Sequence, residues 1–445
     1  MKSLRNRGFS PRLRRNRSGI RFLYRLIYRE WALWVGPVTP DHTDTNLSTP
    51  NLSGAKVQKF GGSSLATPEK IGKVADRIAA DRRAGHDVVV VASAMGGRTD
   101  ALVQLADAVT DSSPPARELD ALLSTGESVS TALLAMALED RGVPAASMRG
   151  WQAGIRTEGP HGHARIAGVE TSALRAELEA GRVPVVCGFQ GIDADGAIQT
   201  LGRGGSDTSA VAIAHALGAT CEIYSDVPGV FSADPRDVPN AALVDHVRYD
   251  EMLAYAQQGA KVLNEDAVAY AQQMDVTIHA RATFLHEEGT RVNAEAPLSV
   301  VTGVASRKLA YRIAGNAGVV EGLAKEHHLV ARRAEDGPHE AAVVLHEGAT
   351  AEDLLGVTVS GPIATVSLVG HRVGELETLG KGELEKAGIP VEAVFLSDCA
   401  LTFVIPHGEP KRASRVLHAG FIEGALGAAL DARLGGRSGS KRLHA

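Results

Sequence analysis

TLGRGGSDTSAVAIAHALGA, from Thr200 to Ala219, places an arginine, a glycine pair, a serine and an aspartate directly ahead of small apolar residues. The apolar residues recur near the helical period and predict a buried helix. Glycines ahead of it permit unusual backbone dihedrals, and free N–H groups at a helix N-terminus favour anions. Two interpretations fit: an anion site, or a glycine-rich turn in which Ser206 or Asp207 is the N-cap. The stretch matches neither the Walker A pattern nor the dinucleotide fingerprint.

Short apolar strands alternate with helices around this stretch. AKVQKFGGSS, from Ala55 to Ser64, predicts a strand that runs into a turn, and Thr67 and Pro68 then open a helix. HDVVVVASAMG, from His86 to Gly96, is a continuous apolar strand of the kind that parallel sheets bury on both faces. This alternation predicts a doubly wound α/β domain that ends near Gly289 to Val292, with ligands where strands end and helices begin.

Composition limits the classes of protein to consider. A chain of 445 residues with 44% hydrophobic and 22% charged residues predicts a soluble globular protein of about two or three domains. An aromatic content of only 4% argues against stacking on single-stranded nucleic acid. No apolar run approaches the ~18 residues of a membrane span. We therefore expect neither a nucleic acid nor a membrane as partner.

The cysteines and histidines show no metal-ligand spacing. Cys187, Cys221 and Cys399 are far apart in apolar surroundings, which predicts reduced core residues of a cytoplasmic protein. Histidines such as His371 are scattered and are expected at the surface. The sequence therefore predicts no protein-held metal.

The N-terminal segment differs from the rest of the chain. Residues 1–55 hold ten Lys or Arg against three acidic residues, a balance of +7 within a net charge of −5. A basic segment with aromatic residues is compatible with a membrane contact, a nucleic-acid contact or a transit-like leader. Because poorly packed basic segments usually lack structure, we predict a disordered extension or a start site placed too far upstream.

The turn after the first strand carries the clearest chemistry. Lys59, Gly61, Gly62 and Ser63 lie at the mouth of that strand. Glycine N–H groups there can cradle phosphates, and a lysine can neutralise a phosphoryl group in transfer. A simple strand-to-helix turn with a solvated lysine fits the same residues.

Six segments in a fixed order resemble one known family. They are VQKFGGSSL, VASAMGGRTD, LSTGESVS, GFQGI, TLGRGGSDTSAVAIA and EIYSDVPGVFSADPR. In this order and spacing they resemble the aspartate kinases of the amino acid kinase superfamily, densely from Val57 to about Val292 and thinly beyond. The resemblance implies an amino acid kinase-like catalytic domain over residues 56–297.

The resemblance also implies an activity. Aspartate kinases transfer the γ-phosphoryl group of MgATP to the β-carboxylate of L-aspartate, giving 4-phospho-L-aspartate on the way to lysine, threonine and methionine. By position, Lys59 would stabilise the moving phosphoryl group and Asp207 would orient that lysine or a neighbouring group. A carboxylate is already a nucleophile, so catalysis needs positioning and charge rather than a strong base.

The family's aspartate-binding positions fall on five residues here. Arg203 would grip a substrate carboxylate with its planar guanidinium, assisted by Ser206 and the helix N-terminus. Glu127 matches the position that meets the substrate ammonium; without the resemblance it reads as an ordinary first-turn acid. Ser93 and Thr99 match the aspartate-side loop after the second strand.

The resemblance also implies nucleotide contacts at the end of the first strand, in EIYSDVPGVFSADPR and at Lys261. The residues that match are Lys59, Phe60, Gly61, Gly62, Ser63, Tyr224, Ser225, Asp226, Asp234, Arg236 and Lys261. ATP and the Mg²⁺ that it carries are the expected cofactors. The chain departs from the family pattern at Asn264, Glu265 and Asp266, where the family usually has His-Pro-Arg. Two acids beside phosphates would repel them unless they face away.

The last third stands where the family has paired ACT domains. Residues 298–435 are predicted to form an α+β region that resembles degenerate tandem ACT domains, followed by a tail over 436–445. Such modules bind amino acid effectors and pair subunits, so a homodimer or higher oligomer is expected. Gly318 occupies the place of a Pro-Gly effector loop whose other residues differ here.

Two other functions stay open at this point. One is a kinase of another amino acid, such as glutamate. The other is a weakly active paralogue that senses amino acids, which the substitutions at Asn264 to Asp266 favour. Lys59, Arg203, Asp207 and Glu127 favour an active aspartate kinase over both.

Overall fold

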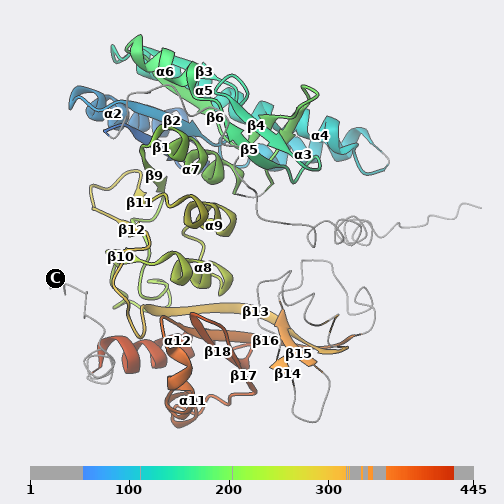
Figure 1. Cartoon of the computed structure of the whole chain (residues 1–445). Helices are drawn as coiled ribbons and strands as arrows, with labels where there is room; N and C mark the ends of the chain where they lie inside the picture. The colour runs from blue at the N-terminus through green and yellow to red at the C-terminus, as the bar shows by residue number, and fades with distance from the viewer. Residues whose placement is uncertain are drawn as a thin grey trace, which may run out of the picture.

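The computed structural model describes residues 54–110, 112–202, 204–316, 318, 320, 332–333, 339–343 and 357–424 of the chain. Residues 1–53 of the predicted extension, all of the predicted tail and Arg203 lie outside these residues. Figure 1 shows an N-terminal part built around one large sheet and, beyond α8 and α9, a second sheet formed by the C-terminal residues.

The large sheet positions the candidate site. Its strand order is β10-β12-β11-β9-β1-β2-β6-β3, and all neighbours are parallel except β11 and β12. Its strands are β1 (Lys56–Phe60), β2 (Val88–Ala92), β3 (Ala145–Met148), β6 (Val183–Cys187), β9 (Thr220–Ser225), β10 (His246–Val247), β11 (Ile278–Ala282) and β12 (Thr290–Val292). Since the strand order changes direction at β1, ligands are expected at its carboxyl end.

Helices cover both faces of this sheet. The helices are α2 (Pro68–Arg83) and α5 (Thr125–Glu139) on one face, and α6 (Ser172–Glu179), α7 (Gly205–Leu217), α8 (Tyr249–Gln257) and α9 (Glu265–Met274) on the other. In β2, Val88 and Val90 pack with the first group, and Val89 and Val91 pack with the second. The predicted doubly wound α/β domain is therefore confirmed.

A smaller sheet lies beside the large one. Its strand order is β5-β4-β7-β8, made of β4 (Ile155–Glu158), β5 (Arg165–Val169), β7 (Gln190–Ile192) and β8 (Ile198–Thr200). Helices α3 (Arg98–Val109) and α4 (Ala116–Leu123) complete this part. The end of β8 leads directly into the glycine-rich entrance of α7.

One helical stretch of the described residues, Ala116–Glu139, is long and apolar enough to cross a membrane by length and composition. It comprises α4 and α5, and Leu134 and Leu138 of α5 pack in the core beside α2. Its charged residues Asp120 and Glu127 are buried inside the protein. We interpret it as a core helix of the catalytic domain.

The C-terminal residues form one antiparallel sheet of order β14-β15-β13-β16-β18-β17. Its strands are β13 (Gly303–Gly315), β14 (Arg332–Arg333), β15 (His339–Val343), β16 (Val357–Val369), β17 (Ala393–Leu396) and β18 (Ala400–Pro406). The helices of this region are η3 (Val373–Leu376), α11 (Glu377–Lys386), α12 (Pro410–His418) and η4 (Ala419–Glu423). Leu384 of α11 and Leu417 of α12 pack in one core with Val366 and Phe403 of the sheet. A pair of ACT units stays a prediction.

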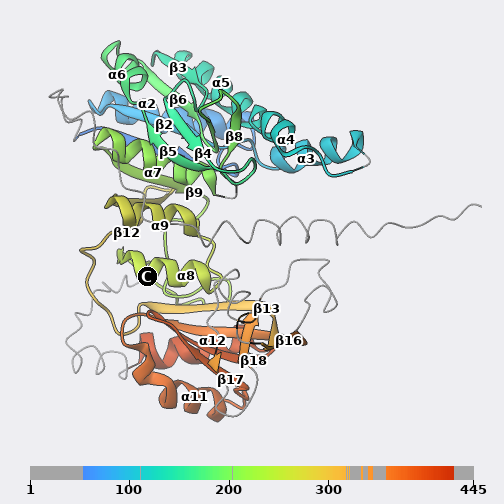
Figure 2. The same ribbon diagram turned by 45° about the vertical axis from the view of Figure 1, so that its right-hand side comes forward.

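The opposite face of this sheet meets the catalytic domain. Gln258, directly after α8, accepts hydrogen bonds from Ser367 at 2.9 Å and Thr402 at 3.2 Å. Figures 1 and 2 both show α8 between the C-terminal sheet and α9. The two parts are thus joined through a buried polar contact.

Candidate active site

The carboxyl ends of β1, β2, β6 and β9 meet at one edge of the large sheet. The backbone connects them: Ser93 N donates to Phe60 O, Gly188 N donates to Ala92 O, and Gly61 N donates to Tyr224 O. Residues that lie far apart in the sequence are therefore gathered where a doubly wound sheet binds its ligand.

Lys59 and Asp207 form the charged centre of this edge. The Lys59 Nζ lies 2.5 Å from Asp207 Oδ1, and the two side chains are only 11% and 13% exposed. Lys59 comes from β1 and Asp207 from the first turn of α7, on the sheet face that α7 covers. The predicted contact between these residues is present, and the lysine is fixed rather than solvated.

The glycine turn after β1 lies against the loop after β2. A Cβ at Gly62 would come within 2.8 Å of Ala94 O, so a side chain here would require the backbone to shift. Gly96 N donates to Gly62 O at 3.0 Å and fixes the same approach. Ser63 beside it is exposed. The missing side chain of Gly62 therefore lets the loop after β2 pack directly against this turn.

Glu127 is a buried carboxylate in the first turn of α5. It is 4% exposed, and Ala94 N donates to its Oε1 at 3.1 Å. Its Oε2 is buried without a hydrogen-bond partner among the described residues. Burial raises the pKa of Glu127 to about 7. A cation brought by a ligand would satisfy this oxygen and restore the ionised form.

Ser93 lies in the loop after β2, and Thr99 lies in helix α3, which follows that loop. Ser93 O accepts a hydrogen bond from Ser130 Oγ of α5 at 2.7 Å. Thr99 is the second residue of α3 and is half-buried. Ser93 therefore lies beside α5, the helix that carries Glu127. The sequence did not predict that Ala94 contacts both Gly62 and Glu127.

The entrance of α7 differs from the predicted cap. The N-cap is Gly204, in the left-handed region at φ 73°, and neither Ser206 nor Asp207 caps the helix. Ser206 is 8% exposed. A Cβ added at Gly188 would come within 2.8 Å of the Ser206 Cβ. Gly188, which sequence reasoning missed, therefore lets the end of β6 approach α7. Arg203 itself lies outside the described residues.

Asn264, where the chain departs from the family pattern, is held between α9 and the entrance of α7. Its Oδ1 accepts from Ala267 N at 3.3 Å and caps α9. A Cβ at Gly204 would come within 1.9 Å of the Asn264 Cγ, so this side chain packs directly behind the α7 entrance. Glu265 accepts a hydrogen bond from Gln257 of α8 at 2.9 Å. Lys261 is exposed in the loop before α9.

Phe60 and Tyr224 are core residues on the opposite face of the sheet from Lys59. Both are 0% exposed, and their rings stack with centroids 4.8 Å apart. The Tyr224 hydroxyl donates to Glu222 at 2.9 Å, and burial raises its pKa. The assignment of these two side chains to the nucleotide site is therefore corrected, and only their main chain borders the site.

The remaining predicted nucleotide residues lie near the end of β9. Ser225 is half-buried and Asp226 is exposed. Arg236 pairs with Asp234 through Nη2 and Oδ2 at 2.7 Å and is 85% exposed. The carboxylate of Asp234 raises the pKa of Arg236, with smaller contributions from Asp237 and Asp226. Arg236 O accepts from Lys411 Nζ at 3.3 Å, so this turn also borders the C-terminal region.

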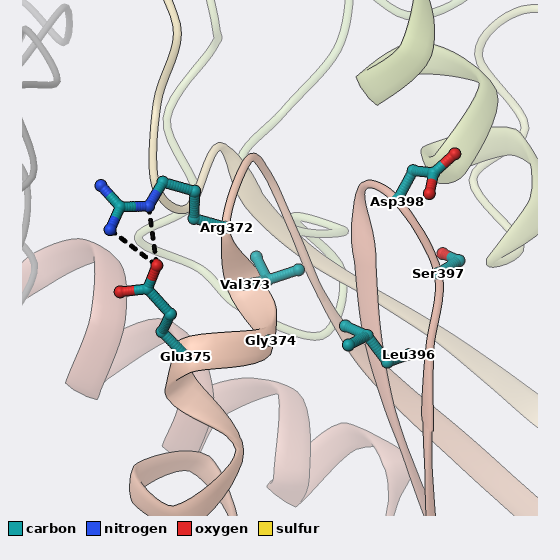
Figure 3. Close-up of a pocket in the computed structure, with 7 residues that line it drawn as sticks. All are labelled: Arg372, Val373, Gly374, Glu375, Leu396, Ser397 and Asp398. Atoms are coloured by element: carbon teal, nitrogen blue, oxygen red, sulfur yellow. Dashed lines mark hydrogen bonds and ion pairs between the residues drawn. The ribbon is translucent and has the colours of Figure 1, made fainter.

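Two features of the C-terminal region lie apart from this edge. One is a cavity of about 470 Å³. Arg372, paired with Glu375, lies on one side of it, and Ser397 and Asp398 lie on the other (Figure 3). Gly318, the predicted effector position, is exposed, and its N–H donates to Asn316 Oδ1 at 3.0 Å. None of the residues predicted for the active site lines this cavity.

His371 is part of the contact between the two domains. Its Nε2 is buried and lies 3.7 Å from Asp250 Oδ1 and 3.8 Å from Glu251 Oε1 of α8. The possible ligand atoms of Asp250, His371 and Cys399 all lie within 4.8 Å of one another. The expectation of a surface histidine was wrong, because the domain contact covers its ring nitrogen.

All three cysteines are free and buried, which confirms their predicted position in the core.

Comparisons with known proteins agree with this geometry. Residues 55–280 match the amino acid kinase family. The chain is 50% identical to Aspartokinase 2 of Bacillus subtilis over 256 residues, 57% of this chain and 62% of that protein. It is 39% identical to the aspartokinase of Mycolicibacterium smegmatis over 402 residues, 82% of this chain and 95% of that protein. The chain thus spans about three fifths of the first relative and nearly all of the second.

A solved structure shows the same fold. The crystal structure of E. coli aspartokinase III in complex with aspartate and ADP superposes with a TM-score of 0.67 at 24% sequence identity, covering 82% of this chain and 99% of that one. The match with the M. smegmatis enzyme extends through both domains. The chain therefore belongs to the amino acid kinase family, and within it to the aspartokinases.

Proposed function

We propose that this protein transfers the γ-phosphoryl group of ATP to the β-carboxylate of L-aspartate and releases 4-phospho-L-aspartate and ADP. The observation that carries the amino acid specificity is Glu127. It holds a buried carboxylate oxygen that no described residue hydrogen-bonds, at the ligand edge of the sheet. A buried carboxylate is stable when a cation pairs with it, and an α-ammonium supplies that cation.

Lys59 carries the phosphoryl-transfer step in this proposal. The buried pair with Asp207 holds its ammonium at the mouth of β1, where negative charge develops during transfer. The substrate carboxylate attacks without a base, so the protein contributes orientation and charge. Arg203 and Ser206 would orient one substrate carboxylate, and Ser93 and Thr99 would border the substrate.

The turn after β1 fits the phosphates of a nucleotide. Gly61, Gly62 and Ser63 follow β1 at the ligand edge of the sheet, and Ser225, Asp226, Asp234, Arg236 and Lys261 complete the nucleotide side as proposals. ATP supplies the phosphoryl group, and the Mg²⁺ that it carries screens the phosphate charges. Asn264 caps α9 and packs against Gly204, and Glu265 accepts a hydrogen bond from Gln257 of α8. Because these side chains are held by contacts within the protein, they support an active kinase over a sensing paralogue.

The substrate is tested by measuring ADP release with a panel of amino acids. We expect turnover with L-aspartate, and at least about tenfold lower kcat/KM with L-glutamate, whose extra methylene displaces the reacting carboxylate. Turnover with glutamate alone would replace the proposed function by the other amino acid kinase activity.

Aspartate binding should depend on the ionisation of Glu127. Since its folded-state pKa is about 7, the ionised form that pairs with the ammonium is depleted as the pH falls below 7. We expect kcat/KM for aspartate to fall by about tenfold per pH unit there. The check is a pH profile of wild type and Glu127→Gln. The same slope in the variant would assign the titration to another group.

Arg203→Lys should raise KM for aspartate strongly, because lysine keeps the charge but loses the two-pronged guanidinium contact. A tenfold or larger rise is expected, on the order of one lost charged hydrogen bond. KM for ATP should change little. Equal weakening of both substrates in steady-state kinetics would place Arg203 on the phosphates instead.

The C-terminal region is proposed to pair subunits, with little or no response to lysine or threonine. Its open antiparallel sheet supports a pairing role, and the altered residues around Gly318 support the weak response. A cytoplasmic location completes the proposal, supported by three free buried cysteines.

A further inference from the structure

Asp120 is a buried carboxylate that the proposed chemistry does not use. It is 1% exposed and is the only buried residue of α4. Charged side chains are almost never fully buried unless they are paired. Its burial therefore calls for partners that the surrounding segments supply.

Both oxygens of Asp120 are engaged. Oδ2 accepts from Gly162 N at 3.0 Å and lies 2.7 Å from His161 Nδ1. Oδ1 accepts from Thr200 Oγ1 at 2.5 Å. The carboxylate thus joins three segments: α4, the connection between β4 and β5, and the last residue of β8.

These segments lie against the loop that carries Arg203. Ala164 N donates to Thr200 O at 3.0 Å, and Gln199 Nε2 donates to Gly159 O at 2.8 Å. A Cβ at Gly202, the residue before Arg203, would come within 3.3 Å of Gly162 O. The connection between β4 and β5 therefore supports the chain up to the neighbour of Arg203.

Asp120 is also linked to the other end of the substrate. Ser124 between α4 and α5 has helical dihedrals, φ −59° and ψ −17°, so the two helices form one nearly continuous stretch. Asp120 and Glu127 stand two helical turns apart, about 10 Å along the axis, and so on the same face. One helical stretch thus carries both Glu127 and Asp120, whose contacts reach the chain next to Arg203.

We infer that Asp120, acting through Thr200, is a positioning residue that fixes the chain up to Gly202, the neighbour of Arg203, relative to Glu127, and so favours an amino acid of the length of aspartate. This inference rests on the proposed function. Without the Asp120 contact, the loop would have to be ordered when substrate binds, and that cost weakens binding.

The test is Thr200→Val, which keeps the shape of the side chain and removes the donor. A hydrogen bond to a charged group contributes about 1.5–3 kcal/mol, so KM for aspartate should rise by about 10-fold or more. KM for ATP should stay within about twofold, because the glycine turn after β1 is untouched. Thr200→Ser, which keeps the hydroxyl, should restore KM.

Asp120→Asn tests the same hydrogen bond from the side of its acceptor. It is expected to raise KM for aspartate similarly, and the double variant should be less than additive because both changes remove one interaction. Additive effects, or equal losses toward ATP and aspartate, would overturn the inference. If Thr200→Val does not fold, Asp120→Asn alone decides, by the ratio of the two KM changes.

Thr365→Val is the matched control. Thr365 is a fully buried strand threonine in the C-terminal sheet whose hydroxyl has no hydrogen-bond partner in the described structure. This variant should keep both KM values. Unchanged KM for aspartate in Thr200→Val beside an active wild type would refute the positioning role, whereas an inactive wild type would refute the proposed function instead.

Discussion

Lys59→Ala should lower kcat by about 10² to 10³-fold while KM for aspartate changes far less. The Lys59 ammonium is held by Asp207 at the mouth of β1, so its charge acts mainly on the phosphoryl group in transfer. In the proposed function, aspartate binding relies on other residues, Arg203 and Glu127. Steady-state kinetics with both substrates varied separates the two effects.

The same substitution should also destabilise the protein. Removing one partner of a buried ion pair leaves an uncompensated charge and costs ~3–5 kcal/mol. The double variant Lys59→Ala with Asp207→Asn should recover much of the melting temperature without recovering turnover. Near-wild-type kcat in the single variant would contradict the role assigned to Lys59, and recovered kcat in the double variant would reduce it to a structural one.

Glu127→Gln should weaken aspartate binding and stabilise the folded protein. Losing the partner of a buried ammonium costs ~3–5 kcal/mol, which corresponds to a rise of roughly 10² to 4 × 10³-fold in KM for aspartate. Glutamine keeps an oxygen for Ala94 N, so the loop after β2 should be preserved. KM for ATP serves as the internal control.

The stability effect of Glu127 has a defined pH dependence. Burial raises its pKa from 4.5 to about 7, so the ionised form is disfavoured in the folded state. The cost is absent below pH 4.5, grows as the pH rises, and reaches up to ~3 kcal/mol above pH 7. The glutamine variant should therefore melt higher than wild type at pH 8 and converge with it near pH 4.5. A variant that melts lower at pH 8 would show that Glu127 is paired within the protein.

Local patterns were sufficient for the domain fold and for part of the site. The apolar runs at β1 and β2 and the cap at Thr67 predict the strand–turn–helix units that the structure contains. The pairing of Lys59 with Asp207 followed from the family motifs, because both residues stand at ends of elements that meet at one sheet edge.

The errors at Phe60 and Tyr224 have a simple geometric cause. Successive side chains of a strand point to opposite faces, so Phe60 points away from the site that Lys59 faces. Tyr224 stands opposite Phe60 in the register of β1 and β9, which places both rings on the same face. Strand alternation alone could have excluded the side chain of Phe60.

Long-range contacts explain what the sequence did not reveal. Asn264 packs behind Gly204 although 60 positions separate them, and Gly188 admits Ser206 across the end of β6. The link from Asp120 to Thr200 spans 80 positions. Such contacts depend on how strands are ordered in the sheets, which periodicity in a single segment does not encode.

The most direct test of the account is the identity of the product. Incubating the protein with MgATP, L-aspartate and hydroxylamine traps an acyl phosphate as its hydroxamate, which chromatography compares with authentic α- and β-aspartohydroxamate. The account predicts β-aspartohydroxamate in an amount equal to the ADP released. The α-isomer, or ADP release without any hydroxamate, would contradict phosphoryl transfer to the β-carboxylate of aspartate.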